Sequence, residues 1–299
     1  MSLLNDEALT NKMTAANNFW DHLKNSLMRN ILTLPHGHRM MRRFIKTYII
    51  SYPKCGRTWL RMMLGKLFHD HFGLDIEDPK LLLETIKLRQ LDNRIPSVRF
   101  SHDDVPQKKL PNEVSADKSM YSGSKVILLV RDPRDAVISN YFQFMKRGRK
   151  QLSGVPDYQG DLSSYLRYEL GSLDSMIRFY NIWAQNRHVP LGFLLISYEG
   201  LHEDTARELR RVLDFIGLDD VDDWTIKRAV EFARFENMRR MEAEGMIDSK
   251  RLKPGDSDDP ESYKTRRGKV GGYIDYLDPE DIDYLNSKIG ADLDSYYGY

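Results

Sequence analysis

The segment 52–58 brings two cations, a glycine and a hydroxyl together directly after a short apolar run. Lys54 and Arg57 are the cations, Gly56 lies between them, and Thr58 carries the hydroxyl. The run 48–50 before them has the pattern of a buried strand, and from Thr58 onward apolar residues recur at the spacing of one helical face. A strand, a glycine-containing loop and a helix N-terminus point backbone N–H groups and a positive helix dipole at an anion. The segment therefore predicts a phosphate-binding loop.

This loop does not follow the Walker A pattern GxxxxGK[ST], because its lysine precedes the glycine. An ordinary strand–helix turn with two solvated cations is the alternative interpretation of these residues alone. The segment YPKCGRTW closely resembles the YPKSGTTW loop of the cytosolic sulfotransferases, which binds the 5′-phosphosulfate end of 3′-phosphoadenosine 5′-phosphosulfate (PAPS). The positions that match are Lys54, Gly56, Thr58 and Trp59, whereas Cys55 and Arg57 depart from the commonest form.

A second arginine follows the clearest buried strand of the sequence, 125–130. In VILLVRDPRDAVISNYFQF, Arg131 comes directly after the strand and Ser139 lies eight residues further on. This segment resembles the sulfotransferase segment that holds the 3′-phosphate, and an arginine offers a bidentate fork to a phosphate. A salt bridge from Arg131 to Asp132 or Asp135 is the alternative.

A third match lies near the C-terminal end, where Arg266, Arg267 and Gly268 in KTRRGKVGG are similar to the family's RKG segment at the 3′-phosphate. A solvated basic loop would look the same. The resemblance also implies residues around the adenine, each of which would be plain core without a nucleotide: Trp59, Tyr198, Phe235 and Met238.

The resemblance implies transfer of a sulfuryl group from PAPS to a hydroxyl or amine of a small-molecule or carbohydrate acceptor, with no metal required. Lys54 would face the bridging oxygen of the donor, and Thr58 with the loop amides would hold the 5′-phosphate. His102 in RFSHDD occupies the place of the family's catalytic base. A strand-end histidine that caps a turn is the alternative. Asp103 or Asp104 could orient His102 or replace it.

One further departure concerns the residue two positions before His102. The family often has a lysine there, and this sequence has Phe100, so an auxiliary charge is missing or comes from elsewhere. The roles of Arg147, Arg149, Lys150 and the segment 246–263 stay open between a lid, a site for an acidic acceptor and solvated loops. The Asp-, Lys- and Pro-rich composition of 246–263 favours mobility.

The elements that must position these residues alternate between strands and helices. Strands are expected at 48–50, 97–101, 125–130 and 191–196, with helices at 79–94, 136–145, 203–216, 224–232, 235–241 and 279–289 and one or two more within 163–184. Such alternation predicts an α/β fold with a parallel sheet wrapped by helices on both faces. Ligands bind at the carboxyl ends of such strands, which Lys54, His102, Arg131 and Tyr198 follow. The resemblance implies the P-loop-NTPase-like sulfotransferase fold in one domain, 47–299, after a helical extension, 1–46.

The composition limits the classes of partner. A chain of 299 residues with a net charge of +1 lacks the globally basic surface of a nucleic-acid-binding protein. The one cysteine precludes an internal disulfide and fits a reducing compartment, and no apolar run reaches 18 residues. We therefore expect a cytoplasmic protein without a membrane span. The family's KxxxTVxxxE dimer segment is not recognisable in GGYIDYLDPED, which leaves the oligomeric state open.

Two other functions compete with sulfuryl transfer. A nucleotide kinase-like phosphotransferase would use the same strand–loop–helix arrangement, although GK[ST] is missing and no Mg²⁺-holding carboxylate ends an apolar strand. A non-catalytic module could keep the nucleotide pocket without a working base. The Mg²⁺ dependence of nucleotide binding distinguishes the phosphotransferase from a sulfotransferase. Turnover of labelled donor distinguishes the non-catalytic module from an enzyme.

Overall fold

The computed structural model describes residues 46–148 and 158–299. The expected extension 1–46 lies outside the described residues except for Lys46, as do Arg149 and Lys150. Within the described part, four parallel strands form one sheet in the order β2-β1-β3-β4. Their bounds are β1 Thr47–Ile50, β2 Val98–Ser101, β3 Lys125–Val130 and β4 Gly192–Ser197. Every residue of β3 is buried, because β3 has a strand on each side and helices on both faces.

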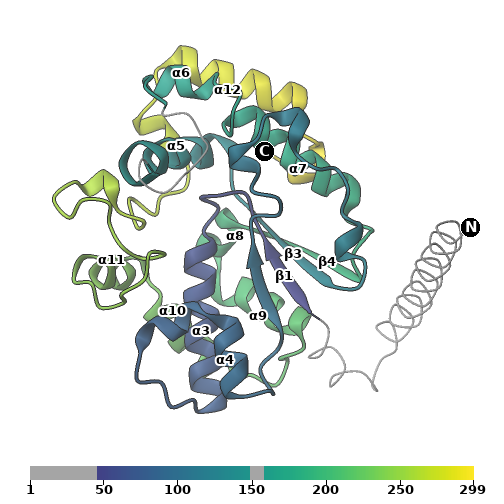
Figure 1. Ribbon diagram of the computed structural model, residues 1–299, viewed down its shortest axis with the longest axis vertical. Helices are drawn as coiled ribbons and strands as arrows, with labels where there is room; N and C mark the ends of the chain where they lie inside the picture. Colours follow the sequence, from purple (N-terminus) through teal and green to yellow (C-terminus); the bar gives the residue numbers. More distant parts are fainter. Residues whose placement is uncertain (1–45, 149–157) are drawn as a thin grey trace, which may run out of the picture.

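Helices cover the sheet on both sides, which confirms the predicted fold class. Figure 1 shows α5, α7 and α12 together on one side of the strands and α3, α9 and α10 on the other. The helices are α3 Arg57–Phe72, α4 Thr85–Leu91, α5 Pro133–Gln143, α6 Leu162–Leu166, α7 Leu173–Asn186, α8 Tyr198–Glu203, α9 Thr205–Ile216, α10 Asp223–Phe232, α11 Phe235–Ala243 and α12 Pro279–Asp292. None of the helices described has the length and apolar character needed to cross a membrane.

Shorter helical turns connect these elements. The 3₁₀ segments are η1 Pro79–Leu83, η2 Pro106–Lys108, η3 Pro111–Glu113, η4 Ser119–Tyr121, η6 Pro260–Ser262, η7 Gly272–Asp275 and η8 Ser295–Tyr297. One π-helical turn, η5 Phe144–Gly148, continues directly from α5. Such turns often occur at functional sites, and this one borders the cavity described below.

Two expectations from the sequence differ from the structure. The helix expected at 79–94 is a 3₁₀ turn followed by α4, because the backbone leaves the helical region at Glu84 (φ −125°, ψ 67°). The next residue, Thr85, donates its hydroxyl to the Val98 carbonyl of β2, 2.9 Å away. The second difference is at the end of β4, where the sequence predicts the first helix from 203. A separate helix, α8, already begins at Tyr198, and its first turn is capped by the Ser197 hydroxyl, which accepts from the Gly200 N–H.

The segment 246–263 is anchored rather than free of the core. Ile247 and Leu252 are almost fully buried, and so is Ser262. The Arg147 guanidinium donates to the Ser262 carbonyl at 3.1 Å, which ties the segment to the turn after α5. Its polar composition therefore reflects its outer face, while its few apolar residues hold it in place.

The strand order places a topological switch point between β1 and β3. The connection after β1 leads to β2 on one side, and the next connection crosses to β3 on the other side of β1. In open parallel sheets this arrangement leaves a crevice beyond the carboxyl ends of the two strands. The residues that follow β1 and β3 therefore face a common space.

A buried polar cluster fixes the chain after β2. The Asp103 carboxylate, 6% exposed, forms an ion pair with Lys118 at 2.8 Å. It also accepts from the Tyr121 hydroxyl at 2.8 Å and from the Trp183 indole N–H at 3.0 Å. Three donors from separate parts of the chain thus converge on one carboxylate.

Removal of this carboxylate is predicted to destabilise the protein strongly. Asp103→Ala leaves Lys118 as an unpaired buried charge, which costs about 3–5 kcal/mol in the free energy of unfolding. Asp104→Ala is the matched control, because Asp104 pairs with Lys109 at the surface and such pairs contribute about 0–1 kcal/mol. Urea unfolding of both variants measures the difference, and equal stabilities would contradict the role given to Asp103.

Candidate active site

One cavity of about 340 Å³ lies at the crevice between the ends of β1 and β3. It collects nearly all the residues that the sequence singles out. The predicted residues that line it are Lys54, Gly56, Arg57, Thr58, Trp59, His102, Arg131, Ser139, Tyr198, Phe235, Met238, Arg266, Arg267 and Gly268. Cys55 alone among the predicted site residues is absent from the lining.

The loop after β1 brings backbone to the cavity in an unusual conformation. Lys54 and Gly56 both have left-handed backbones, with φ values of 75° and 89°. A Cβ atom at position 56 would lie 2.7 Å from the Tyr198 ring, so only glycine lets the loop approach that ring. Helix α3 begins at Arg57, and its first N–H groups lack partners within the helix. This loop can therefore cradle an anion.

The Lys54 ammonium lies among other cations. It donates to the Gln143 side-chain oxygen at 3.3 Å. Burial lowers its pKa well below the usual value, and Lys264, Arg147, Arg266 and Arg131 lower it further. An anion in the cavity would reverse this effect by stabilising the charged lysine.

The Cys55 side chain turns away from the cavity into the core. It is fully buried, and its sulfur lies 3.4 Å from the Tyr180 hydroxyl. Burial raises the pKa of the thiol to about 12. Cys55 can therefore reach a ligand only through its backbone, and the thiol has no part in the chemistry.

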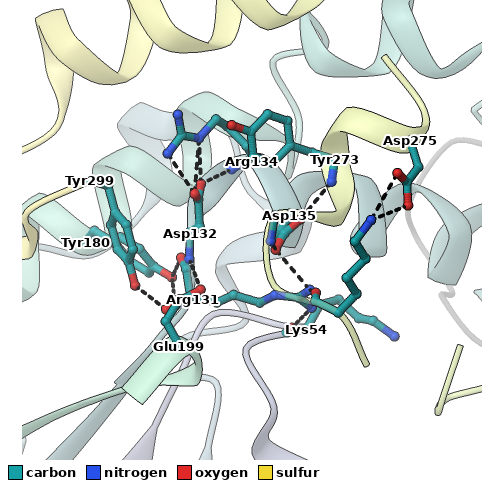
Figure 2. Close-up of polar contacts among 12 residues, drawn as sticks. Lys54, Arg131, Asp132, Arg134, Asp135, Tyr180, Glu199, Tyr273, Asp275 and Tyr299 are labelled. Atoms are coloured by element: carbon teal, nitrogen blue, oxygen red, sulfur yellow. Dashed lines mark hydrogen bonds and ion pairs between the residues drawn. The ribbon is translucent and has the colours of Figure 1, made fainter. Parts of the chain in front are cut away.

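Arg131 spans the space between the strand ends (Figure 2). Its guanidinium donates to the carbonyls of Lys54 (3.3 Å) and Lys269 (3.0 Å), and it lies 3.4 Å from the Asp135 carboxylate. Asp135 also accepts from the N–H groups of Gly271 and Tyr273. The ion pair considered as an alternative thus exists, and it holds Arg131 at the cavity wall. The buried Nε of Arg131 has no hydrogen-bond partner among the described residues.

The segment 266–268 closes the same end of the cavity. Arg266 pairs with Glu261 at 2.9 Å, and its guanidinium lies 4.4 Å from the Phe142 ring centroid. Arg267 pairs with Asp275 at 2.9 Å. Gly268 has a φ of 61°, and a Cβ there would lie 2.4 Å from the Phe235 ring. The close approach of chain and ring explains why a glycine occurs beside the two arginines.

Aromatic rings form another wall. The Trp59 and Tyr198 rings meet edge to face with centroids 5.9 Å apart, and the Arg131 guanidinium lies 4.2 Å from the Tyr198 centroid. His202 of α8 lies 4.9 Å from Trp59. The buried Trp59 indole N–H has no partner in the described part of the chain. A flat heteroaromatic ligand would fit this wall by stacking.

His102 is held as a neutral imidazole. Its Nδ1 lies 2.9 Å from the Ser51 carbonyl, which can only accept, so Nδ1 carries the proton and Nε2 is an acceptor. The Arg57 guanidinium donates to Nε2 at 2.5 Å. Burial, reinforced by the charge of Arg57, lowers the pKa of His102 well below its usual value. A general base must be neutral, as this histidine is, and the Nε2 lone pair that would take a proton is engaged by Arg57.

Neither neighbouring aspartate contacts His102. Asp103 is committed to the buried cluster around Lys118, and Asp104 pairs with Lys109. Asp103, Asp104 and Val105 all have left-handed backbones, which is rare for consecutive residues with side chains. The Ser51 carbonyl, and neither aspartate, therefore orients the imidazole.

Phe100, which stands two residues before His102 where the family often has a lysine, packs against an arginine. The Arg61 guanidinium of α3 stacks on the Phe100 ring, 4.3 Å from its centroid. This stacking uses the planar face of the arginine. Phe100 thus packs against a cation from α3.

Sequence reasoning did not single out several residues of the cavity. Gln143 contacts Lys54, and Lys264 and Thr265 line the wall. Lys264 and Thr265 directly precede Arg266 in KTRRG, so the basic character of that segment was a usable signal. No sequence signal pointed to Gln143, because its place depends on how far α5 extends.

The cavity has little capacity for a metal ion. In the described part of the chain no cluster of three or more His, Cys, Asp or Glu side chains has the geometry of a metal site. Asp135 is the only carboxylate among the described lining residues, and it is already engaged by Arg131 and two N–H groups. Cations and backbone dipoles therefore dominate the chemistry of the site.

Comparisons with known proteins agree with this geometry. The family described as "Sulfotransferase domain" matches residues 45–296. Cytosolic sulfotransferase 16 of Arabidopsis thaliana is 26% identical over 253 residues, covering 78% of this chain and 71% of that protein. Sulfotransferase 1B1 of Mus musculus is 22% identical over 288 residues, covering 89% and 90%.

Solved structures share the fold. A retinol dehydratase in complex with androsterone and PAP aligns with a TM-score of 0.54 and 19% identity, over 83% of this chain and 81% of that one. A mouse sulfotransferase complexed with PAP aligns with a TM-score of 0.55 and 16% identity, over 87% and 90%. The family match spans the loop after β1, the start of α5 and the segment 266–268, and the chain therefore belongs to the sulfotransferase domain family, as its motifs predicted.

Proposed function

We propose that this protein transfers a sulfuryl group from PAPS to a hydroxyl or amine of an acceptor. The main observation behind the proposal is that cations gather at two ends of one cavity. Lys54 and the start of α3 form one end, and Arg131 with Arg266 and Arg267 forms the other. The solved relatives that share this fold hold PAP, the adenosine 3′,5′-bisphosphate that remains after transfer.

The nucleotide would bind with its two phosphate ends at these two sets of cations. The loop amides and Thr58 would hold the 5′-phosphate, and Arg131 with Ser139 and the arginines of 266–267 would hold the 3′-phosphate. At Gly56 and Gly268 the backbone lies against the Tyr198 and Phe235 rings, and an adenine would stack on these rings. The unpartnered Nε of Arg131 and indole N–H of Trp59 are donors that a bound nucleotide could satisfy.

In the proposed transfer step, one residue acts on the acceptor and another on the leaving oxygen of the donor. His102 Nε2 takes the acceptor proton while the acceptor oxygen forms the new bond to sulfur. The bond from sulfur to the 5′-phosphate oxygen breaks, and its electron pair remains on that oxygen, where Lys54 stabilises the charge. Positioning and charge stabilisation supply the catalysis, as in phosphoryl transfer. The acceptor must displace the Arg57 guanidinium from Nε2 for this step.

A phosphotransferase that uses ATP and Mg²⁺ is less well supported. Such an enzyme needs an available carboxylate to hold the metal. Asp135, the one carboxylate of the described lining, already pairs with Arg131.

We further propose that the sulfotransferase domain comprises 47–299 after an extension 1–46. A cytoplasmic location is proposed from the names of the plant relatives.

Nucleotide binding tests the function directly. Adenosine 3′,5′-bisphosphate should raise the melting temperature without Mg²⁺, and ATP with Mg²⁺ should not. Arg131→Ala should weaken bisphosphate binding about 10- to 100-fold, because it removes charge-assisted hydrogen bonds worth about 1.5–3 kcal/mol. Arg210→Ala is the control, since Arg210 pairs with Asp223 at a surface outside the cavity lining. A preference for ATP–Mg²⁺ would overturn the proposal.

Turnover tests the catalytic roles. Lys54→Ala should lower kcat about 10²–10³-fold through lost stabilisation of the leaving oxygen, and His102→Ala about 10²–10⁴-fold through the lost base. Both variants should still bind the bisphosphate. Lys87→Ala, an exposed position on α4, should behave like the wild type. Near-normal rates in His102→Ala would exclude this residue as the base.

The charge of Lys264 in the cavity wall is predicted to lower the stability of the protein. Burial lowers the pKa of Lys264 to about 7, with further lowering by Arg147 and Arg57 against the raising effect of Glu242. The unfolded chain holds this proton up to about pH 10.4, so the penalty is full below pH 7 and fades as the pH rises towards 10. Lys264→Met should therefore melt at a higher temperature than the wild type, most clearly below pH 7.

Thermal unfolding between pH 6 and pH 10 measures this effect. Lys227→Met is the control, because Lys227 is exposed on α10. A stability gain for Lys264→Met that does not change with pH would contradict the assignment to a buried charge.

A further inference from the structure

A second cavity of about 600 Å³ adjoins the nucleotide cavity. The two share Arg57, Thr58, Gln143 and Lys264 in their walls. The start of α3, the π turn after α5 and the segment 250–255 enclose the second cavity. In Figure 1 the chain that follows α11 lies beside α5, on the side away from β4. The shared residues place the two cavities side by side.

The lining of this cavity is strongly positive. Eight of its thirteen described lining residues are lysine or arginine, and none is aspartate or glutamate. Three of the cations have a carboxylate partner outside the lining: Arg147 with Glu242, Lys146 with Asp259, and Arg251 with Glu84. The others form no ion pair with a carboxylate of the described residues.

These unpaired cations fall into two groups. Arg57, Arg61 and Lys264 lie at the inner end, towards His102, and Lys250 and Lys253 lie at the exposed outer end. Burial lowers the pKa of Arg57, and the charges of Arg61 and Arg251 lower it further. Burial and the charge of Arg251 also lower the pKa of Arg61. Arg61 is buried and Arg57 and Lys264 are partly buried, and cations withdrawn from water that repel one another are costly unless something else in the site compensates them.

The nucleotide does not account for this charge. Both phosphate ends of the donor have their own cations in the first cavity, from Lys54 to Arg267. Arg61, Lys250, Arg251 and Lys253 line the second cavity alone. The acceptor is the remaining component of the reaction, and it must approach His102 from the side that Arg57 occupies.

We propose that the acceptor of this sulfotransferase carries more than one anionic group beside its nucleophilic hydroxyl, and that the second cavity binds these groups. Sulfate, phosphate and carboxylate share the required chemistry, since each accepts bidentate hydrogen bonds from a guanidinium. An inner anion on Arg57 would draw its guanidinium from His102 Nε2 and leave that nitrogen open to the acceptor hydroxyl. An outer anion would meet Lys250 and Lys253. The inference rests on the proposed function, because it names the substrate class of the same site.

Acceptors with an increasing number of anionic groups test the proposal. With labelled PAPS, we expect kcat/KM to rise about five- to tenfold with each added anion in the series phenol, 4-hydroxybenzoate and 5-hydroxyisophthalate. The same order should hold for N-acetyllactosamine and its 6-sulfated form. High salt should reduce the advantage of the charged members. Equal use of neutral and anionic acceptors would overturn the proposal.

Variants locate the effect in the second cavity. Lys250→Gln/Lys253→Gln and Arg61→Gln should each raise KM for the anionic acceptors about five- to tenfold and leave KM for the neutral ones unchanged. Arg57→Thr, which restores the commonest family residue, should lower the ratio of anionic to neutral activity most. Lys227→Gln is the control. Variants that change neutral and anionic acceptors equally would contradict the assignment.

A binding measurement separates failure of this inference from failure of the proposed function. Adenosine 3′,5′-bisphosphate should bind the wild type, Lys250→Gln/Lys253→Gln and Arg61→Gln with the same affinity, and loss of that binding in the wild type would refute the function itself. Titration of the 6-sulfated disaccharide and of 5-hydroxyisophthalate into the bisphosphate complex decides the acceptor class if turnover is too slow to measure. Absence of binding by both anionic probes would overturn the inference while the function stands.

Discussion

Lys54 and Arg131 follow neighbouring parallel strands and reach one cavity, where burial removes much of the water that would screen their charges. Other parts of the structure compensate for holding these cations close together away from water. Asp135 pairs with Arg131 and binds the backbone at 271 and 273, so a single carboxylate both fixes the arginine and docks the C-terminal segment. Glu242 acts similarly for Arg147 and the backbone of Lys264 and Thr265. The remaining positive charge is left for anionic ligands.

Much of the fold followed from the sequence, because its strands carry strong local signals. The run 125–130 has no polar residue after Lys125, and burial on both faces demands that pattern. Gly56 was informative because a left-handed backbone against a ring admits little else. Helix ends were harder: the break at Glu84 depends on a hydroxyl bond from Thr85 to β2, which is a tertiary contact.

The site was predictable where each residue follows a strand and less so where distant segments meet. Arg131 and His102 could be named from their positions after β3 and β2. The proton on His102 Nδ1 depends on the Ser51 carbonyl, and the cation near Phe100 comes from Arg61, one turn inside α3. The second cavity needs three segments of the chain to converge, so its charge could not be read from any one of them.

Cys55 stands where the commonest family loop has a serine, and the structure puts its sulfur against Tyr180 in the core. Thiols react with alkylating agents and oxidants as thiolates, and burial holds this one protonated. Because the chain contains no other cysteine, the protein is insensitive to thiol reagents as long as the loop stays closed. The rate at which a thiol reagent labels this sulfur would therefore report how often the phosphate loop detaches from the core. No cysteine would have to be introduced for this measurement.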